Sequence, residues 1–295
     1  MKLADGDFLL PVDKPVGPTS HDVVGMARRA LRTRRVGHTG TLDPFASGLL
    51  VLCVGRATRL SEYFTGMDKS YDAVARLGIE TDTLDLEGEV VSTNDAWRDL
   101  DRASIESATG TQAGSIEQVP PQFSAKKVDG EAMHRRARRG EEVALRSVPV
   151  TVHELTVTDA PLPDLHFTVR CSSGTYIRAI ARDLGTALGC GAHLTTLRRT
   201  RVGPFDLSRA LPVSALDDES AVTAACMEPS EGLHHLTTVT VDDGVASRIR
   251  NGQRVRIADP GSASDALVTV TCGADLLAMA TLDDGVLRPR KVFPA

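Results

Sequence analysis

The sequence lacks any long hydrophobic run, and this absence limits where the protein can work. No apolar stretch approaches the roughly 20 residues that a membrane-spanning helix needs. The first residues, Met1–Asp7, also lack the basic segment followed by an apolar one that marks a secretory signal peptide. We therefore expect no membrane association and a cytoplasmic location.

Cysteine is sparse, and its spacing argues against two common scaffolds. The five cysteines are odd in number and form no Cys-x-x-Cys pair. Cys190 and His193 show the only metal-like spacing, which is a weak signal without a second pair. We therefore expect buried thiols, with neither a structural metal nor a disulfide framework.

The sequence also lacks the basic excess that is typical of nucleic-acid-binding proteins, because its net charge is -5. The charges are unevenly distributed, however. Residues 1–212 carry 27 basic and 27 acidic side chains, whereas residues 213–295 carry 7 and 12, and many acids gather between Glu80 and Asp101. Separated patches of opposite sign can create a local polyanion site on an acidic protein.

The arginines of residues 1–212 gather in three runs. These are Arg28, Arg29, Arg32, Arg34 and Arg35, then Arg135, Arg136, Arg138 and Arg139, then Arg198, Arg199 and Arg201. A solvated helix face explains any single run. Three runs in one neutral segment favour contacts with phosphates instead.

One glycine-rich stretch, Gly37–Gly48, stands out from the rest of the chain. It reads Gly-His-Thr-Gly-Thr-Leu-Asp-Pro-Phe-Ala-Ser-Gly and runs into the apolar segment Leu49–Val54. Glycine permits positive φ and close backbone approach, and Pro44 disfavours the α conformation for Asp43. We expect Asp43 on an extended or turn residue braced by a buried strand. Both a presented nucleophile and an ordinary turn fit this pattern.

Two helices are expected near this stretch and near residue 178. Ser20 is a good N-cap for a helix whose apolar residues run from Val23 to Leu31. A second apolar stripe, from Ile177 to Leu188, predicts a helix with Arg178 in its first turn. Because the helix dipole disfavours a cation there, Arg178 should have an anionic partner.

A length of 295 residues allows one large domain and a small one. Residues 1–212 mix strand and helix patterns, with an exposed excursion at about residues 117–146. Residues 213–234 predict a helix-containing linker. The short strands expected within residues 235–295 predict a small barrel-like domain.

Six motifs in one order resemble the TruB family of bacterial tRNA pseudouridine synthases. They are Asp13-Lys-Pro-x-Gly-x-Thr-Ser20, Gly37-His-Thr-Gly-Thr-Leu-Asp-Pro44, Lys69-Ser-Tyr-x-Ala73, Val119-Pro-Pro-x-x-Ser-Ala-x-Lys-Val128, Gly174-Thr-Tyr-Ile-Arg178 and Leu197-Arg-Arg-Thr-Arg-Val-Gly203. The resemblance covers residues 8–209. Asn251-Gly-Gln-Arg-Val255 and Arg290-Lys-Val-Phe293 resemble the small PUA-type domain of the family.

The resemblance implies both a fold and a reaction. The fold is an α+β pseudouridine-synthase fold, a mixed and largely antiparallel sheet flanked by helices, with an RNA-gripping insertion and a small C-terminal PUA-like β-barrel domain. The reaction is the cofactor-free isomerisation of uridine to pseudouridine at position 55 in the T-loop of tRNA, by a monomer that binds the T-arm stem-loop. The target base must be flipped out before chemistry.

The resemblance also assigns roles residue by residue. Asp43 matches the nucleophile, which either adds to C1′ or takes a proton from the ribose to give a glycal. Arg178 would pair with Asp43 and keep it ionised. Tyr71 would stack on the target base and is a candidate for removing the C5 proton.

The remaining assignments concern RNA binding. His38 would fill the space left by the extruded nucleotide, and Leu197 would supply an apolar wall. Tyr176 would pack near the sugar, and Lys14 would lie near the catalytic loop. The contacts to the RNA backbone are assigned to five arginines, Arg135, Arg136, Arg138, Arg139 and Arg198.

The insertion departs from the family pattern in one place, because Gly130 is followed by Glu131-Ala132-Met133 and not by an early aromatic residue. Two other functions fit the same surface. One is a non-catalytic RNA-binding or tRNA-folding protein, and the other is a synthase that acts on another RNA within a guided complex. The presence of both Asp43 and Arg178 favours the enzyme.

Overall fold

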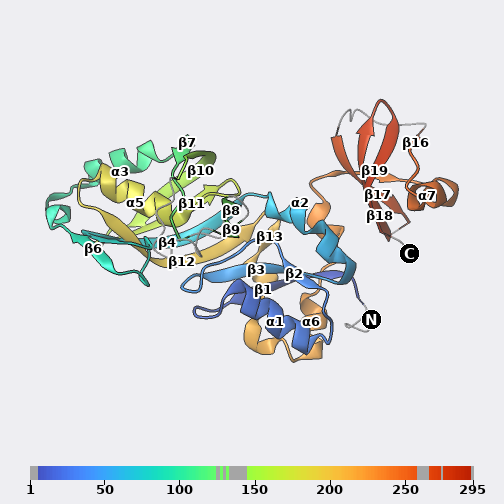
Figure 1. Ribbon diagram of the computed structural model, residues 1–295, viewed down its shortest axis with the longest axis horizontal. Coiled ribbons are helices and arrows are strands. Elements are labelled where there is room, and N and C mark those ends of the chain that lie inside the picture. Colours follow the sequence, from blue (N-terminus) through green and yellow to red (C-terminus); the bar gives the residue numbers. More distant parts are fainter. Residues whose placement is uncertain are drawn as a thin grey trace.

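The computed structural model describes residues 6–123, 127–128, 131–132, 145–257, 266–273 and 275–293. These residues form a large sheet, a smaller five-stranded sheet and two hairpins. The large sheet and its helices occupy one part of the molecule, and the smaller sheet stands at one end (Figure 1). None of the helices described is long and apolar enough to cross a membrane.

The large sheet is mixed and mostly antiparallel, as the sequence predicted. Its main path runs β14-β1-β3-β12-β4-β11-β10-β7, with β13 paired to β12 and β2 paired to β3. Only the β1–β14 and β3–β12 pairs are parallel. The strands are β1 (Phe8–Lys14), β2 (Val36–His38), β3 (Ser47–Val54), β4 (Lys69–Leu77), β7 (Gly114–Gln118), β10 (Val148–Asp159), β11 (Asp164–Cys171), β12 (Ala192–Val202), β13 (Phe205–Asp206) and β14 (Leu211–Pro212).

Helices cover the large sheet on both faces (Figure 1). They are α1 (Ser20–Ala30), α2 (Ser61–Thr65), α3 (Arg102–Thr111), α5 (Ile177–Ala187) and α6 (Glu219–Ala225). The apolar stripe of α5 packs with strand residues such as Tyr71 and Leu197 in one core cluster. Residues of α1 and α6 pack with β1 and β3 in another. The apolar stripes of these helices thus pack against the sheet and are buried there, as their helical spacing predicts.

The start of α1 differs from the sequence prediction by one residue. Thr19, and not Ser20, is the N-cap, since its hydroxyl accepts from the Asp22 amide at 3.1 Å while the Asp22 carboxylate binds back to Thr19. This reciprocal capping box satisfies two backbone donors at once. Ser20 is thereby left free for another contact, described below.

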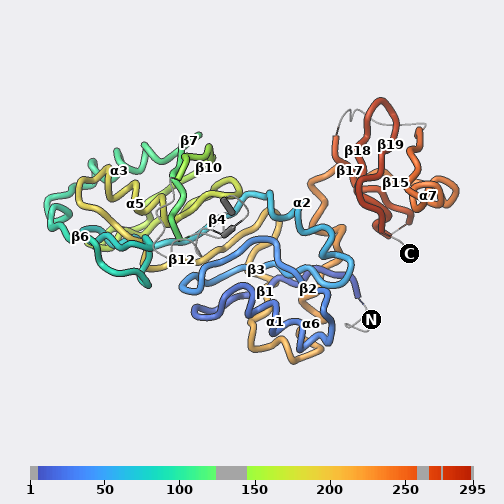
Figure 2. The backbone as a smooth tube through the Cα atoms, in the orientation of Figure 1, coloured from blue at the N-terminus to red at the C-terminus, as the bar shows by residue number. Residues whose placement is uncertain are grey.

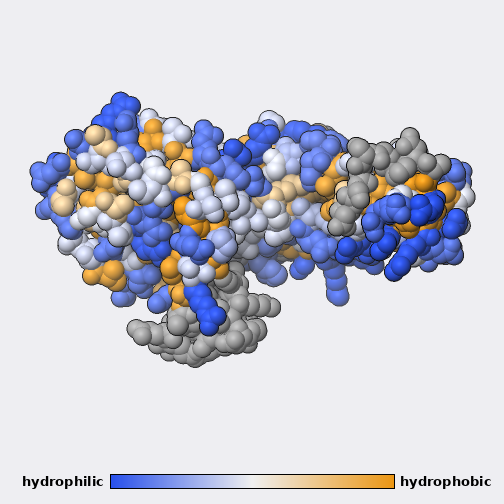
Figure 3. Space-filling view, turned by 90° about the horizontal axis from the view of Figure 1, so that it is seen from above, coloured by the Kyte–Doolittle hydropathy of each residue, from blue (hydrophilic) through white to orange (hydrophobic). Residues whose placement is uncertain are grey.

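The smaller sheet forms a curled half-barrel at the C-terminal end of the chain. Its order is β15-β17-β18-β19-β16, and helix α7 (Asp243–Arg250) packs against it. The strands are β15 (Thr237–Thr240), β16 (Val255–Arg256), β17 (Ala266–Cys272), β18 (Asp275–Asp283) and β19 (Val286–Val292). Figure 2 traces the chain from the large sheet into this C-terminal domain. Figure 3, seen from above, shows the domain as a lobe at one end, with hydrophobic residues interspersed among hydrophilic ones.

The C-terminal domain docks on the large sheet through specific contacts. The Lys291 ammonium lies 2.5 Å from the Glu62 carboxylate and donates to the Arg59 carbonyl at 2.6 Å. Met279 and Phe293 belong to a core cluster that is otherwise built mostly from the large sheet and α2. The two domains therefore share one buried apolar cluster.

Two short hairpins complete the described residues. Strands β8 (Lys127–Val128) and β9 (Glu131–Ala132) pair within the insertion. Strands β5 (Ile79–Thr81) and β6 (Val90–Thr93) pair in the other hairpin, and residues 82–89 form its tip. That tip reaches the site described next.

Candidate active site

The segment between β2 and β3, residues 39–46, carries Asp43 and is called here the Asp43 loop. The fully buried Ser20 hydroxyl donates to the Leu42 carbonyl at 3.0 Å and accepts from the Leu42 amide at 2.7 Å. The Gly17 amide donates to the Pro44 carbonyl at 2.9 Å. Gly17 before α1 and Ser20 at its start therefore fix the backbone on both sides of Asp43.

The side chain of Lys14 also holds the Asp43 loop in place. Its buried ammonium donates to the carbonyl oxygens of Pro15, Pro18 and Pro44, at 2.9, 2.8 and 3.4 Å. Burial lowers the pKa of Lys14 to about 8, although the nearby Asp43 carboxylate opposes the shift. The structure thus places Lys14 behind the Asp43 loop, where it holds backbone oxygens.

Arg199 of β12 also stabilises the Asp43 loop through hydrogen bonds. Its side chain is only 1% exposed and donates to the carbonyls of Gly40 at 2.9 Å, Thr41 at 3.3 Å and Leu49 at 2.8 Å. The sequence placed Arg199 in an arginine run suited to phosphates. That interpretation is wrong for Arg199, because its guanidinium is used inside the protein.

The parallel β3–β12 pair brings Arg199 this close because of one glycine. Gly48 has φ +100, and a Cβ there would lie 2.3 Å from the Arg199 carbonyl oxygen. Only glycine fits this position. The predicted close backbone approach within Gly37–Gly48 is confirmed at Gly48.

Arg178 joins three separate segments of the chain through its guanidinium. Its Nε lies 3.1 Å from Oδ2 of Asp43, and its Nη1 lies 3.1 Å from Oδ2 of Asp85 at the tip of the β5–β6 hairpin. Nη1 also donates to the Thr83 carbonyl at 2.8 Å, and Nη2 donates to the Phe123 carbonyl at 2.9 Å. The anionic partner expected for an arginine in the first helical turn is confirmed.

The carboxylates around Arg178 differ in exposure. The Asp85 side chain is 5% exposed and that of Asp43 is 37% exposed. Burial raises the pKa of Asp43, the Arg178 charge lowers it, and the Asp85 charge adds to the upward shift. The net direction is upward, because Arg178 offsets only part of the burial effect.

A cavity of about 240 Å³ opens beside Asp43. Its lining residues come from the Asp43 loop, β4, α2, the start of α5 and β12. They are Gly40, Thr41, Leu42, Asp43, Thr65, Lys69, Tyr71, Gly174, Thr175, Tyr176, Ile177, Arg178, Leu197 and Arg199. One carboxylate, two tyrosines and an apolar wall therefore share a space with three buried cations, Lys69, Arg178 and Arg199.

Lys69 and Tyr71 both belong to β4, and both line this cavity. The Lys69 ammonium donates to the carbonyls of Thr65 at 2.8 Å and Met67 at 2.6 Å, and burial lowers its pKa to about 8. Burial raises the pKa of the Tyr71 phenol, and the Arg199 charge opposes the shift. Tyr71 therefore remains protonated at neutral pH.

Gln118 positions the backbone of Tyr176, which lines the cavity. The fully buried amide of Gln118 accepts from the Tyr176 amide at 2.8 Å and donates to the Tyr176 carbonyl at 3.1 Å. Tyr176 is the N-cap residue of α5 and has no side-chain cap of its own. The last residue of β7 thus fixes the start of the helix that carries Arg178.

The structure brings together most residues proposed from the sequence. Five of them line the cavity, namely Asp43, Tyr71, Tyr176, Arg178 and Leu197. His38 and Lys14 are absent from that lining. The other predicted RNA contacts divide between one described arginine, Arg198, and four, Arg135, Arg136, Arg138 and Arg139, that lie outside the described residues.

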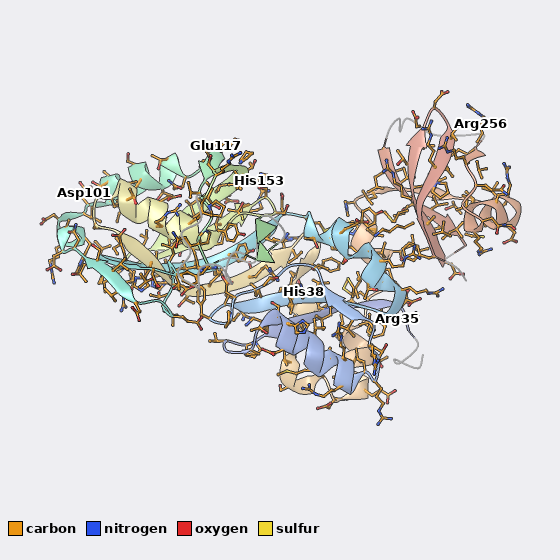
Figure 4. The ribbon with its side chains drawn as sticks, in the orientation of Figure 1. Arg35, His38, Asp101, Glu117, His153 and Arg256 are labelled. Atoms are coloured by element: carbon orange, nitrogen blue, oxygen red, sulfur yellow. The ribbon has the colours of Figure 1, made fainter. Side chains whose placement is uncertain are left out.

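His38 lies at the end of β2, and Figure 4 shows it near the middle of the large sheet. Its Nδ1 accepts from the Gly40 amide at 3.2 Å, so the neutral ring carries its proton on Nε2. Burial, with the Arg199 charge, lowers the pKa of His38. Arg198, in contrast, forms a two-point ion pair with Asp13, at 2.7 and 3.0 Å.

Sequence reasoning missed four side chains of this site, which are Lys69, Asp85, Gln118 and Arg199. Asp85 was counted among the acids set apart from the arginines, yet it pairs with Arg178. Alternation along β12 could have identified Arg199, because Leu197 and Arg199 are two residues apart and share a face. Among the residues described, no group of three His, Cys, Asp or Glu side chains is placed to hold a metal ion.

Three family models match successive parts of the chain. The model described as "TruB family pseudouridylate synthase (N terminal domain)" matches residues 28–177. The model described as "tRNA pseudouridylate synthase B C-terminal domain" matches residues 178–238. The model described as "Pseudouridine synthase II TruB, C-terminal" matches residues 237–293.

Curated relatives cover nearly the whole chain. The tRNA pseudouridine synthase B of Thermobifida fusca (strain YX) is 44% identical over an aligned length of 300 residues that covers 99% of this chain and 99% of its own length. The protein of the same name from Burkholderia mallei (strain NCTC 10247) is 42% identical over 97% of this chain and 96% of its own length.

Two solved structures resemble the model over its length. The structure reported as a Cbf5-Nop10-Gar1 complex has a TM-score of 0.76 and 26% identity, over 97% of this chain and 85% of that one. The structure of an H/ACA RNP bound to a substrate RNA containing 2'-deoxyuridine has a TM-score of 0.78 at 24% identity, over 100% of this chain and 87% of that one. At that identity, the second likeness concerns the fold alone.

Proposed function

The chain belongs to the TruB family of pseudouridylate synthases, and from this premise we propose that it isomerises uridine 55 in the T-loop of tRNA with Asp43 as the nucleophile. Family models over residues 28–293 and relatives at 42–44% identity identify it as a tRNA pseudouridine synthase, an isomerase that acts on tRNA. The predicted pseudouridine-synthase fold with a PUA-like C-terminal domain is confirmed.

The ion pair between Asp43 and Arg178 at the wall of the cavity carries the proposal. Catalysis needs an ionised carboxylate near the ribose while the N1–C1′ bond breaks and its electron pair leaves with the uracil. Asp43 then either holds C1′ covalently or takes a proton from the ribose, and both routes require the same anion. C5 of the retained base then bonds to C1′, which breaks the bond to Asp43 in the covalent route or is accompanied by return of the ribose proton from Asp43 in the glycal route. C5 loses its proton and N1 gains one.

Tyr71 and Leu197 suit the binding of the flipped base. Both side chains are buried and line the cavity. Because burial raises the Tyr71 pKa, we assign this phenol to stacking on the base in preference to removing the C5 proton. Tyr176, whose backbone is fixed by Gln118, is assigned to the sugar.

The remaining assignments extend the same proposal. His38 enters the space of the extruded nucleotide, and Lys14 acts on substrate through the Pro44 backbone that it holds. Arg198 and the arginines at 135, 136, 138 and 139 contact the RNA backbone. The enzyme acts as a cytoplasmic monomer on the T-arm stem-loop. The two sheets support a division into a catalytic domain (1–212), a linker (213–234) and a C-terminal domain (235–295).

An Asp43→Asn variant tests the nucleophile. We expect it to bind a T-arm hairpin as wild type does but to release no tritium from C5-labelled uridine, since an amide cannot supply the anion. Asp72→Asn is the matched control, because Asp72 is an exposed carboxylate one residue from Tyr71. Tritium release by Asp43→Asn near the wild-type rate would refute the assignment.

A further inference from the structure

Four exposed arginines cluster where the chain leaves α1 and enters β2. They are Arg29, Arg32, Arg34 and Arg35, and this set is called here the arginine turn. Arg29 lies in the last turn of α1, and the others lie in the connection to β2. Four like charges within seven residues repel one another unless an anion lies among them.

The arginine turn has no carboxylate partner among the described residues, a condition that it shares with single exposed arginines such as Arg201 and Arg254. Elsewhere in the described chain, exposed arginines are often paired, as Arg76 is with Asp164 at 2.8 Å and Arg102 with Glu106 at 2.7 Å. None of the four side chains of the arginine turn has an ion pair or a side-chain hydrogen bond with another described residue. Their donors face solvent.

The backbone of Arg32 adds an independent observation. It has φ 52, in the left-handed region that favours glycine. It follows α1, where the Thr33 amide donates to the Arg28 carbonyl at 3.2 Å, an arrangement that usually ends in glycine. A side chain is thus kept at a position where a residue without one would fit better.

Compensation of the helix dipole explains only part of the cluster. Arg28 and Arg29 lie in the last helical turn, where cations are favourable. The effect falls off within that turn, so it does not explain Arg34 and Arg35. Arg28 is also used internally, since it donates to the Val36 carbonyl at 2.9 Å.

The arginine turn leads directly to the Asp43 loop. Strand β2 spans only Val36–His38, so Arg35 and His38 are about 10 Å apart along an extended strand. In Figure 4, Arg35 lies beyond His38 on the side of the C-terminal domain. One short strand therefore joins the arginine turn to the Asp43 loop.

We propose that the arginine turn binds the phosphodiester backbone of the tRNA substrate outside the nucleotides held in the cavity. The inference rests on the proposed function, because it takes tRNA as the substrate. Guanidinium groups without carboxylate partners pair with phosphate oxygens through two parallel hydrogen bonds. Arg32 keeps its left-handed backbone because its side chain serves this contact.

The test compares Arg32→Gly with the triple variant Arg32→Gly, Arg34→Gln, Arg35→Gln. Dissociation constants would be measured for full-length tRNA and for a T-arm hairpin, from 50 to 200 mM salt. We expect the triple variant to bind at least about tenfold more weakly at low salt, and its log–log salt slope to fall by about 2. Weakening with both RNAs would place the contact on the T-stem, and weakening with tRNA alone would place it on the tRNA body.

Two controls separate binding from folding. Arg32→Gly should melt at the same temperature as wild type or higher, because glycine relieves the left-handed backbone, although its RNA binding should be weaker than that of wild type. Arg102→Gln removes one exposed charge from α3 and should leave the salt slope unchanged. Unchanged affinity and slope in the triple variant would overturn the proposal.

The same variants distinguish this proposal from the proposed function. At saturating RNA, the triple variant should release tritium at the wild-type rate, whereas Asp43→Asn should bind normally and release none. Loss of turnover at saturating RNA in the triple variant would contradict a role restricted to binding.

Discussion

The Ser20 hydroxyl holds the Leu42 backbone at both of its polar groups, donating to the carbonyl at 3.0 Å and accepting from the amide at 2.7 Å. Leu42 immediately precedes Asp43, so one buried hydroxyl fixes the peptide unit that orients the carboxylate. A side chain at the start of α1 thereby controls a loop 22 residues further along the chain.

Ser20→Ala should impair stability and turnover together. The substitution leaves a buried amide and carbonyl without their partner, which typically costs about 1–3 kcal/mol of unfolding free energy. Asp43 also loses its fixed orientation, so the single-turnover rate should fall. Urea unfolding and tritium release measure the two effects.

Thr19→Ala is the matched control for this change. Loss of an N-cap typically costs about 1 kcal/mol, but the Asp43 loop keeps its hydrogen bonds. Turnover below the melting temperature should stay close to wild type. An equal loss of turnover in both variants would show that stability alone is responsible.

Turnover should fall on acidification at a higher pH than an ordinary aspartate would cause. Burial raises the Asp43 pKa above 3.8, and catalysis needs the ionised form. Activity is therefore present above the raised pKa and is lost as the pH falls through it. Asp85→Asn removes a negative neighbour, so the acidic limb of the single-turnover profile should move to lower pH.

Asp82→Asn is the control for the acidic limb. Asp82 lies on the same hairpin tip, where it accepts from the Glu89 amide at 2.8 Å, and it is not among the charges that shift Asp43. Its profile should keep the wild-type midpoint. A midpoint for Asp85→Asn at or above that of wild type would contradict the electrostatic role of Asp85.

Because of Lys69, the free energy of unfolding should depend on pH in the alkaline range. Its pKa is about 8 in the folded protein and near 10.5 when unfolded, so the unfolded chain binds more protons between these values. Stability therefore rises with pH in this window. The difference between the unfolding free energies of wild type and Lys69→Met should increase by roughly 3 kcal/mol from pH 7 to 11. A difference that stays constant with pH would rule out a buried, charged Lys69.

Gln118→Leu should release the start of α5. Its side chain accepts from the Tyr176 amide, so an apolar replacement leaves that amide without a partner, whereas the Tyr176 carbonyl keeps the Ala179 and Ile180 amides. We expect a higher KM and a lower turnover rate. Gln112→Leu, at the exposed end of α3, should change neither.

A bare T-arm hairpin should be a sufficient substrate for the isolated protein. The structure reported as an H/ACA RNP resembles this chain at 24% identity, and that likeness concerns the fold alone. Tritium release from the hairpin without any other component would support the stand-alone enzyme. Activity that appears only with an added guide RNA or protein would favour the guided complex.

Local sequence signals predicted an anionic partner for Arg178, because it lies in the first turn of a helix, and an extended or turn conformation for Asp43, because Pro44 follows it. The family resemblance then matched the two residues as a pair. The role of Asp85 could not be predicted from the sequence, because its burial depends on the β5–β6 hairpin folding back towards α5. An acid in an acidic passage looks solvated until that long-range contact is known.

Arg199 and Ser20 show two other limits of reading a sequence. Arg198 and Arg199 are chemically identical neighbours, and only the pleat of β12 turns one to solvent and the other inside. Ser20 and Thr19 are both good N-caps, and the reciprocal bond with Asp22 decides between them. In both cases a shift of one residue changes the role of the side chain.

The position of β12 in the large sheet has a consequence for synthesis. This strand lies between β3 and β4, although it follows them by more than 100 residues. A nascent chain that ends before residue 192 therefore exposes two unpaired strand edges and lacks both Arg199 and Leu197. The ribosome must release most of the large domain before any substrate pocket exists, so incomplete chains should be inert towards tRNA and depend on chaperones to keep those edges apart.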